Sequence, residues 1–226
     1  DRIPDQATHH IRTPGVKLDP GVLRKLTEAI RSDLVIVVEA GGHEVARQRI
    51  EVNVLPPSHW GGVSAAPELL AAFVRPNDPA VDVILREAAE KLASSGRESA
   101  IDGYRSNKKA RVWEIAEAIW VALASRRITY VLPPASFERV GQKVRSPSDI
   151  LDRGVGTCLD LSLLYAACLE QAGLNPLVVL LEGHAAAGLW LKDESFSSSL
   201  VDDVQILRKR RDLEDDLVAR RDRPAE

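Results

Sequence analysis

A cysteine at the expected start of a helix is the residue of this sequence best suited to chemistry. Cys158 lies in the segment Arg153–Asp160, written RGVGTCLD, directly after a glycine-rich turn and at the beginning of an apolar stretch. The partial positive charge at a helix N-terminus stabilises a thiolate, which is the reactive form of cysteine. The segment therefore predicts a thiol nucleophile.

A histidine follows at a position from which it can assist this thiol. His184 lies between Gly183 and Ala185, directly after the apolar run Leu177–Leu181. A chain that leaves a helix, turns and returns as a strand can bring the strand end close to the helix start. An imidazole placed there can take the proton of the Cys158 thiol.

Each of these two residues alone has a simpler explanation. A single free cysteine is more often a small buried hydrophobe, and a single histidine at a strand end is more often only a polar residue. Gly154 and Gly156 allow the backbone to bend tightly beside a reacting group, while Gly183 and Gly188 leave room around the histidine. The combination favours a thiol–imidazole site, and a buried structural cysteine stays as the alternative.

The elements that must position the pair are predicted by periodicity and by capping residues. A helix is expected over 158–172, because Thr157 and Asp160 have the spacing of a capping pair. Two strands are expected after it, over 177–181 and 185–191. Helix and strands together predict a small antiparallel sheet that returns along the helix.

The rest of the chain divides into a β-rich beginning and a helical middle. Strands over 34–39 and 45–55 flank Gly41-Gly42 and predict a hairpin, and residues 21–31 are a short helix or another strand. Residues 1–20 are expected to form an irregular arm. Further helices are predicted over 67–74, from Pro79 to the stop at Ser94-Ser95-Gly96, over 110–125 and from Ser146, with an extended segment over 128–132.

Composition limits the classes of function. The chain has 226 residues, 45% of them hydrophobic, and a net charge of −3, so it gives no whole-chain case for nucleic-acid binding. No apolar run approaches the ~20 residues that span a bilayer. The chain begins at Asp1 and holds no methionine, which we expect of a fragment of a longer protein.

Other candidate sites carry less weight. Cys168 is expected to be a small core residue that cannot pair with Cys158, because ten helical residues rise ~15 Å. His9-His10 has no cysteine or acid cluster at zinc-ligand spacing. The basic run 208–211 precedes three acids and favours a solvated helix. No phosphate-binding glycine loop ends in Lys-Ser or Lys-Thr, which argues against nucleotide hydrolysis.

The stretches GTCLD at 156–160, AGLNP at 172–176 and GHA at 183–185, together with the alanine-rich helix, resemble the core of the transglutaminase-like superfamily. The resemblance covers about 111–191. It implies a papain-like thiol enzyme with a Cys, His, Asp triad, in most members a protease or amidase rather than a cross-linking enzyme. The chain looks most like bacterial modules found near helicase-like and nuclease-like parts of large proteins, some tied to antiphage defence.

The resemblance assigns roles to residues. Cys158 matches the nucleophile and His184 the general base, whereas the acid that orients the imidazole is the weak point. Asp193 comes too soon after the histidine, and Asp222 does not follow the usual pattern of the family. Asp202 and Asp203 are left, although both can instead cap a helix over 204–211. Asp203 is the preferred candidate. Gln142 is either an oxyanion donor, as papain-like sites often use, or a surface-loop glutamine. Asp160 is expected to be a cap.

The sequence therefore predicts an α+β protein: a β-rich segment over 1–64, a papain-like, transglutaminase-core domain over 65–204 and a charged segment over 205–226. The predicted function is cytoplasmic hydrolysis of amide or peptide bonds, with a protein or peptide as substrate, no metal or organic cofactor, and other domains or subunits of a larger bacterial complex as partners. The alternative is a catalytically silent protein-binding module of a larger helicase-type protein.

Overall fold

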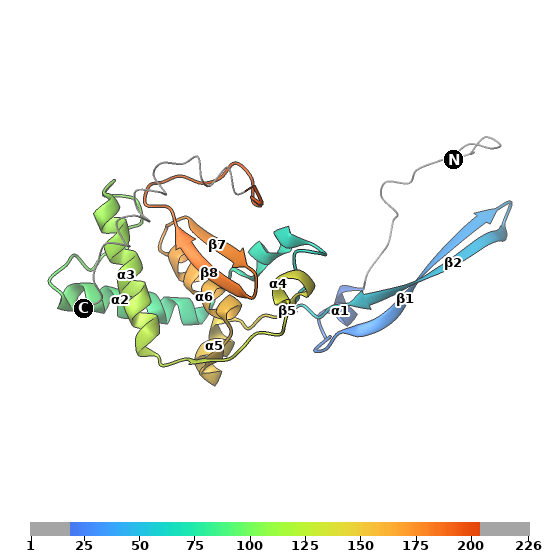
Figure 1. Cartoon of the computed structure of the whole chain (residues 1–226), viewed down its shortest axis with the longest axis horizontal. Helices are drawn as coiled ribbons and strands as arrows, with labels where there is room; N and C mark the ends of the chain where they lie inside the picture. The colour runs from blue at the N-terminus through green and yellow to red at the C-terminus, as the bar shows by residue number, and fades with distance from the viewer. Residues whose placement is uncertain (1–18, 204–226) are drawn as a thin grey trace. The chain divides into compact units, whose positions relative to one another are not determined.

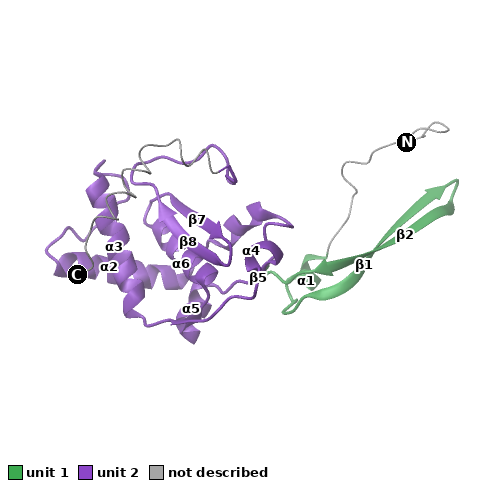
Figure 2. Cartoon of the chain, viewed as in Figure 1, with its two compact units in different colours: residues 1–59 green, residues 60–226 purple. Residues whose placement is uncertain are grey.

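The computed structural model describes residues 19–203, and these fall into two compact units (Figures 1 and 2). The units span Asp1–His59 and Trp60–Glu226, so the division comes five residues before the predicted end at 64. The described residues combine helices with small two-stranded sheets, which agrees with the predicted α+β class. Residues 1–18 of the predicted arm, with His9-His10, and the charged segment over 205–226 lie outside the described residues.

The first unit consists of a short helix and a long β-hairpin. Helix α1 (Pro20–Leu23) begins after Asp19, whose carboxylate accepts a hydrogen bond from the Gly21 N–H at 2.8 Å. Strands β1 (Ile30–Ala40) and β2 (His43–Val54) pair antiparallel, with a bulge after Val38. The turn between them is Gly41-Gly42, with φ of 58° and 81°, as glycine permits. The predicted hairpin is confirmed, although both strands are longer than expected.

The second unit is built around three helices that share one hydrophobic core. The 3₁₀ helix η1 (Pro67–Phe73) is followed by α2 (Pro79–Ser94), α3 (Lys109–Ser125) and α6 (Cys158–Gln171). The apolar stripes of the last three meet, and the buried residues at their junction include Ile84, Ile115, Ile119, Leu164 and Cys168. Cys168 is thus the core residue that the sequence predicted.

Two strands return along α6, as the sequence predicted. β7 (Pro176–Leu181) and β8 (His184–Leu189) form an antiparallel hairpin that lies over α6 in Figure 1. A second buried cluster fills the space between them and contains Cys158, Leu159, Leu163 and Ala185. This cluster joins the start of α6 to the start of β8, which are the two places that carry the candidate chemistry.

Short elements complete the second unit, and one of them, β4, lies within the predicted extended segment 128–132. The two-residue strands pair as β3 with β5 and β4 with β6, and the four-residue helix α4 precedes β5. Helix α5 begins at the predicted Ser146 cap, whose hydroxyl accepts a hydrogen bond from the Asp149 N–H at 3.1 Å. The bounds are β3 (His59–Trp60), β4 (Thr129–Tyr130), α4 (Phe137–Val140), β5 (Gln142–Lys143), α5 (Pro147–Arg153) and β6 (Val155–Gly156).

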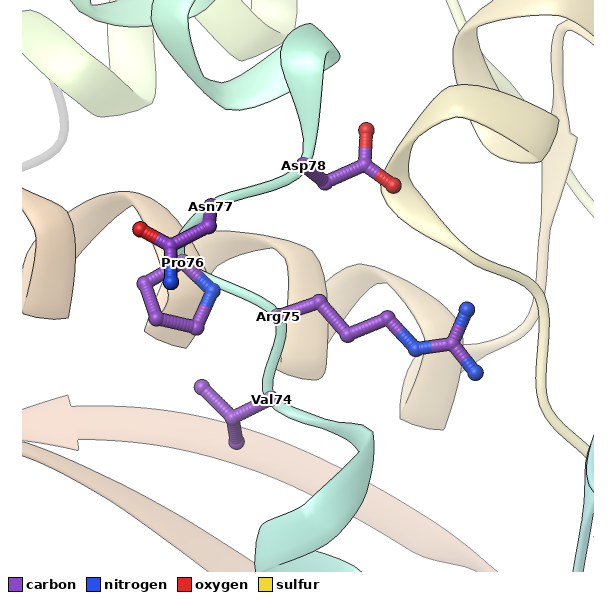
Figure 3. A pocket seen from close by; sticks show the side chains of 5 residues that line it. All are labelled: Val74, Arg75, Pro76, Asn77 and Asp78. Atoms are coloured by element: carbon purple, nitrogen blue, oxygen red, sulfur yellow. The ribbon is translucent and has the colours of Figure 1, made fainter.

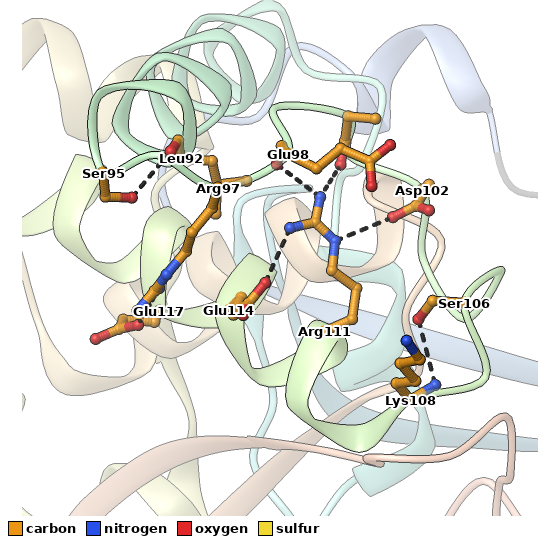
Figure 4. Close-up of polar contacts among 11 residues, drawn as sticks. Leu92, Ser95, Arg97, Glu98, Asp102, Ser106, Lys108, Arg111, Glu114 and Glu117 are labelled. Carbon is orange, nitrogen blue, oxygen red and sulfur yellow. Dashed lines mark hydrogen bonds and ion pairs between the residues drawn. The ribbon is translucent and has the colours of Figure 1, made fainter.

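A buried arginine fixes the loop between α2 and α3 (Figure 4). The Arg111 guanidinium donates to the carbonyl oxygens of Glu98 and Ala100 at 2.8 and 2.6 Å. It also lies 3.0 Å from a Glu114 carboxylate oxygen and 3.5 Å from one of Asp102, although Arg111 is only 8% exposed. Removing this cation would leave buried acceptors without a partner.

We predict that Arg111→Ala lowers the free energy of unfolding by about 3 kcal/mol, as expected when one partner of a buried ion pair is lost. Urea denaturation would measure the change. Arg97→Ala is the matched control, because the Arg97–Glu117 ion pair of 2.7 Å lies at the surface and should contribute far less to stability than the buried contacts of Arg111. Equal losses in the two variants would contradict the structural role of Arg111.

Candidate functional site

Cys158 is the first residue of α6, and a capping box fixes the turn before it. The Thr157 side chain accepts a hydrogen bond from the Asp160 N–H at 3.3 Å, and an Asp160 carboxylate oxygen accepts one from the Thr157 N–H at 3.0 Å. The predicted capping pair is confirmed. The thiol therefore sits where the unpaired N–H groups of the helix concentrate positive charge.

Asp160 is a structural acid, as expected. Its side chain is completely buried. Besides the bond from Thr157, it accepts one from the backbone N–H of Arg145 at 2.8 Å and one from the Arg145 guanidinium at 2.7 Å. All of these bonds hold the carboxylate in place, so it is not free to orient a histidine.

Gln142 is buried beside the capping residue of α6. It is only 4% exposed, so the alternative of a surface-loop glutamine is wrong. Its side-chain amide donates to the Thr157 hydroxyl at 3.0 Å, while its Oε1 atom is buried without a hydrogen-bond partner. The amide thus lies next to the backbone of the nucleophile segment, and its use as an oxyanion donor stays a prediction.

The chain before Gln142 explains why this side chain is held so closely. Gly141 has a φ of 83°, and a Cβ at this position would lie 1.9 Å from the carbonyl oxygen of Trp60. Gly62 is equally confined, since a Cβ there would lie 2.2 Å from the Arg139 carbonyl oxygen. Only glycines permit this contact between two backbones, which packs the chain just before Gln142 against Trp60–Gly62.

Tyr130 is a site residue that the sequence analysis missed. In the parallel pairing of β4 with β6 it lies opposite Gly156, and the Val131 N–H donates to the Gly156 carbonyl at 3.0 Å. Desolvation and then a hydrogen bond with the Cys158 thiol raise the pKa of Tyr130. Cys158 is only 4% exposed, whereas Tyr130 is 47% exposed. Tyr130 therefore lies within hydrogen-bonding reach of the thiol, a position that no periodic pattern could reveal.

His184 begins β8, next to the residue that packs against α6. Ala185 is 3% exposed and belongs to the same buried cluster as Cys158. Because successive side chains of a strand point to opposite faces, the exposed His184 starts from the face turned away from α6. Among the described residues, no hydrogen bond joins its imidazole to the thiol. The structure thus brings the two backbones near each other without joining the side chains.

The predicted acids lie at different distances from this histidine. Asp193 accepts a hydrogen bond from the Asn175 side chain at 3.2 Å, and Asn175 lies just before Pro176, at the end of the β7–β8 hairpin opposite His184. Six strand residues separate the two ends by about 17 Å, which excludes Asp193 as its partner. Asp202 and Asp203 are exposed, Asp222 lies outside residues 19–203, and a role for Asp203 stays a prediction.

A different acid lies beside His184. The half-buried Glu138 accepts a long hydrogen bond of 3.4 Å from the N–H of Gly183, the residue that precedes the histidine. Glu138 belongs to α4, which begins after Ser136 in a left-handed conformation. Neither feature has a signature in the sequence, so this acid was missed.

A surface pocket lies on the segment between η1 and α2, lined by Val74, Arg75, Pro76, Asn77 and Asp78 (Figure 3). Arg75 and Asp78 point to one side of the segment, and Asn77 points to the other. The Asp78 carboxylate is already used, since it caps α2 at Ala80 and accepts from Ser148. None of the predicted site residues lines this pocket.

The described residues give no sign of a metal centre or of a membrane span. Within 19–203, no three His, Cys, Asp or Glu side chains gather in a way that would hold a metal ion. In the same range, no helix combines the length and apolar character needed to cross a bilayer. Comparison with protein-family models, with curated proteins and with solved structures gave no match to this chain.

We predict that Tyr130→Ala raises the rate at which iodoacetamide alkylates Cys158 by about five-fold or more. The variant removes the Tyr130 ring beside the Cys158 thiol and one hydrogen bond of about 1 kcal/mol. Mass spectrometry of the labelled peptide would measure the rate. Leu132→Ala is the control, because Leu132 is 85% exposed and lies just after the same strand. An unchanged rate in Tyr130→Ala would show that the tyrosine does not shield the thiol.

Proposed function

We propose that this chain is a thiol-dependent hydrolase of amide or peptide bonds, with Cys158 as nucleophile and His184 as general base. The observation that carries the proposal is the position of Cys158 at the first turn of α6, with the buried Gln142 amide hydrogen-bonded to the residue before it. Helix N–H groups and a side-chain amide are the donors that acyl-transfer sites use.

The proposed reaction follows from these groups. His184 takes the thiol proton, and the sulfur attacks the carbonyl carbon of the substrate amide. The backbone N–H of Cys158 and the Gln142 side chain stabilise the oxyanion. The leaving amine receives the proton from His184 as the C–N bond breaks, which leaves a thioester. Water, activated by His184, then releases the acid and restores the thiol.

Two movements must precede this chemistry. Tyr130 must leave the Cys158 sulfur, since the thiol is 4% exposed. The His184 side chain must also turn around the end of β8 toward α6. Gly183 has a φ of 68°, and no atom lies within 4 Å of the place that a Cβ would take, so the backbone has room for this change. Substrate entry is the event that we expect to drive both movements.

The remaining parts of the proposal come from the resemblance to the transglutaminase-like superfamily. They are a papain-like core, a protein or peptide substrate, a cytoplasmic location, a role in bacterial defence, and Asp203 as the acid that orients His184. Glu138 is an alternative acid that comes from the structure, and it is better supported than Asp203 because it contacts Gly183.

A second function is favoured by a specific observation. The covered thiol and the outward-facing histidine are what a catalytically silent module would have, with Cys158 as a core residue and the fold retained for protein binding. The two functions differ in one measurable property, the reactivity of the thiol.

The rate at which iodoacetamide alkylates Cys158 near neutral pH distinguishes them. For a working Cys–His pair we predict rapid modification, because the imidazole takes the thiol proton. In His184→Ala this rate should fall about tenfold.

Cys168→Ser provides the background for this experiment. Burial raises the pKa of the Cys168 thiol to about 12, so Cys168 stays protonated and slow to react in the folded protein throughout the useful pH range. Slow alkylation of Cys158 that does not change in His184→Ala or Tyr130→Ala would contradict the enzymatic proposal. The catalytically silent binding module would then be the favoured function.

A further inference from the structure

The extended segment that contains β4 passes beside the start of α6. Its backbone is bound to β6, since the Val131 N–H donates to the Gly156 carbonyl oxygen at 3.0 Å. Successive side chains of an extended segment point to opposite sides. Ile128, Tyr130 and Leu132 therefore share one side of the segment, which we call the thiol-facing side.

The three side chains of the thiol-facing side have different surroundings. Ile128 packs against the hydrophobic core that α2, α3 and α6 share. Tyr130 reaches the Cys158 thiol with its hydroxyl group. Leu132 follows and is 85% exposed, more than any other large hydrophobic side chain in the described part of the chain. The thiol-facing side thus runs from the core, past the candidate nucleophile, into solvent.

The chain after Leu132 keeps this side chain in water. Leu132 precedes Pro133-Pro134. A residue before proline is restricted to extended conformations, and each proline fixes its own φ near −65°, so the segment does not fold back onto the core. A single exposed leucine is ordinary on a protein surface. Leu132 differs in its place, because it is fixed two residues along from the tyrosine that contacts the thiol.

We propose that Leu132 selects substrates that carry a large apolar side chain, such as leucine or phenylalanine, within two residues of the bond that Cys158 cleaves. The inference rests on the proposed function and adds its substrate class. Two extended residues span about 7 Å, so this distance separates Leu132 from Tyr130 along the segment. A peptide that runs along the segment, with its reacting carbonyl at the sulfur, meets Leu132 about two residues from that carbonyl.

The exposure of Leu132 sets the size of the expected preference. At 85% exposure, nearly the whole side chain is available for burial against a substrate. Removing a leucine side chain from water on binding corresponds to a factor of about ten in affinity. A substrate with glycine at the same place buries little of this surface and should bind correspondingly more weakly.

Two chloromethyl ketones that differ only in their side chains test the selection in the full chain with the Cys168→Ser background. The probes are Ac-Leu-Leu-chloromethyl ketone and Ac-Gly-Gly-chloromethyl ketone. With either probe a sulfur–carbon bond forms at Cys158 as chloride leaves, and mass spectrometry of the labelled peptide measures the rate. In the unmodified chain we expect the leucine probe to react about tenfold faster. In Leu132→Ala this ratio of rates should fall to about two.

Leu69→Ala is the matched control, because Leu69 is also an exposed leucine, at 60%, and lies on η1. It should leave the ratio unchanged. Leu132→Ile keeps an apolar side chain suited to extended backbone, so its ratio should stay within about two-fold of that of the unmodified chain. Iodoacetamide has no side chain to bury, and the rate of its reaction with Cys158 should be the same in Leu132→Ala.

The ratio of rates separates this inference from the proposed function. His184→Ala should slow both probes and leave their ratio unchanged, because the ratio reports recognition rather than proton transfer. Rapid labelling with an equal ratio in the unmodified chain and in Leu132→Ala would overturn the role of Leu132 and leave the hydrolase proposal in place. If neither probe labels Cys158, both proposals are overturned, and the exposed leucine is assigned to a contact with another protein.

Discussion

The buried carboxylate of Asp160 holds together three parts of the second unit. It accepts hydrogen bonds from the backbone before α6 and from the backbone and side chain of Arg145, and through Thr157 it is linked to Gln142. A buried charge without such partners would cost several kcal/mol, so these segments must meet in one arrangement for the unit to fold. The same bonds that stabilise the fold therefore fix the position of Cys158 at the helix start.

This arrangement places opposing influences on the thiol. The N–H groups at the start of α6 favour a thiolate, whereas the neighbouring carboxylate of Asp160 disfavours one, and Arg145 offsets that negative charge. Tyr130 adds a hydrogen bond to the thiol, and Cys158 itself is buried. The structure thus fixes a buried thiol at the start of the helix. Whether the chain acts as a hydrolase depends on the movements of Tyr130 and His184 rather than on building a new site.

Sequence patterns predicted the long elements and the capping box, because each depends on neighbours within one turn or one strand. The hairpin around Gly41-Gly42, the helices from Pro79 and before Ser125, and the paired strands after α6 were all confirmed. The site was predictable only in part. Tyr130 and Glu138 reach it through a two-residue strand and a four-residue helix, too short for any periodicity. The outward direction of His184 follows from the strand register, which the histidine itself does not reveal.

Acyl transfer by Cys158 with the help of His184 can be measured with p-nitrophenyl acetate in the Cys168→Ser background. We expect a burst of p-nitrophenol that approaches one equivalent per chain, an acetyl group on Cys158 detected by mass spectrometry, and slower loss of that group in His184→Ala. An acetyl group that never forms on Cys158, even in Tyr130→Ala where the thiol is uncovered, would contradict the claim and identify the cysteine as a structural residue.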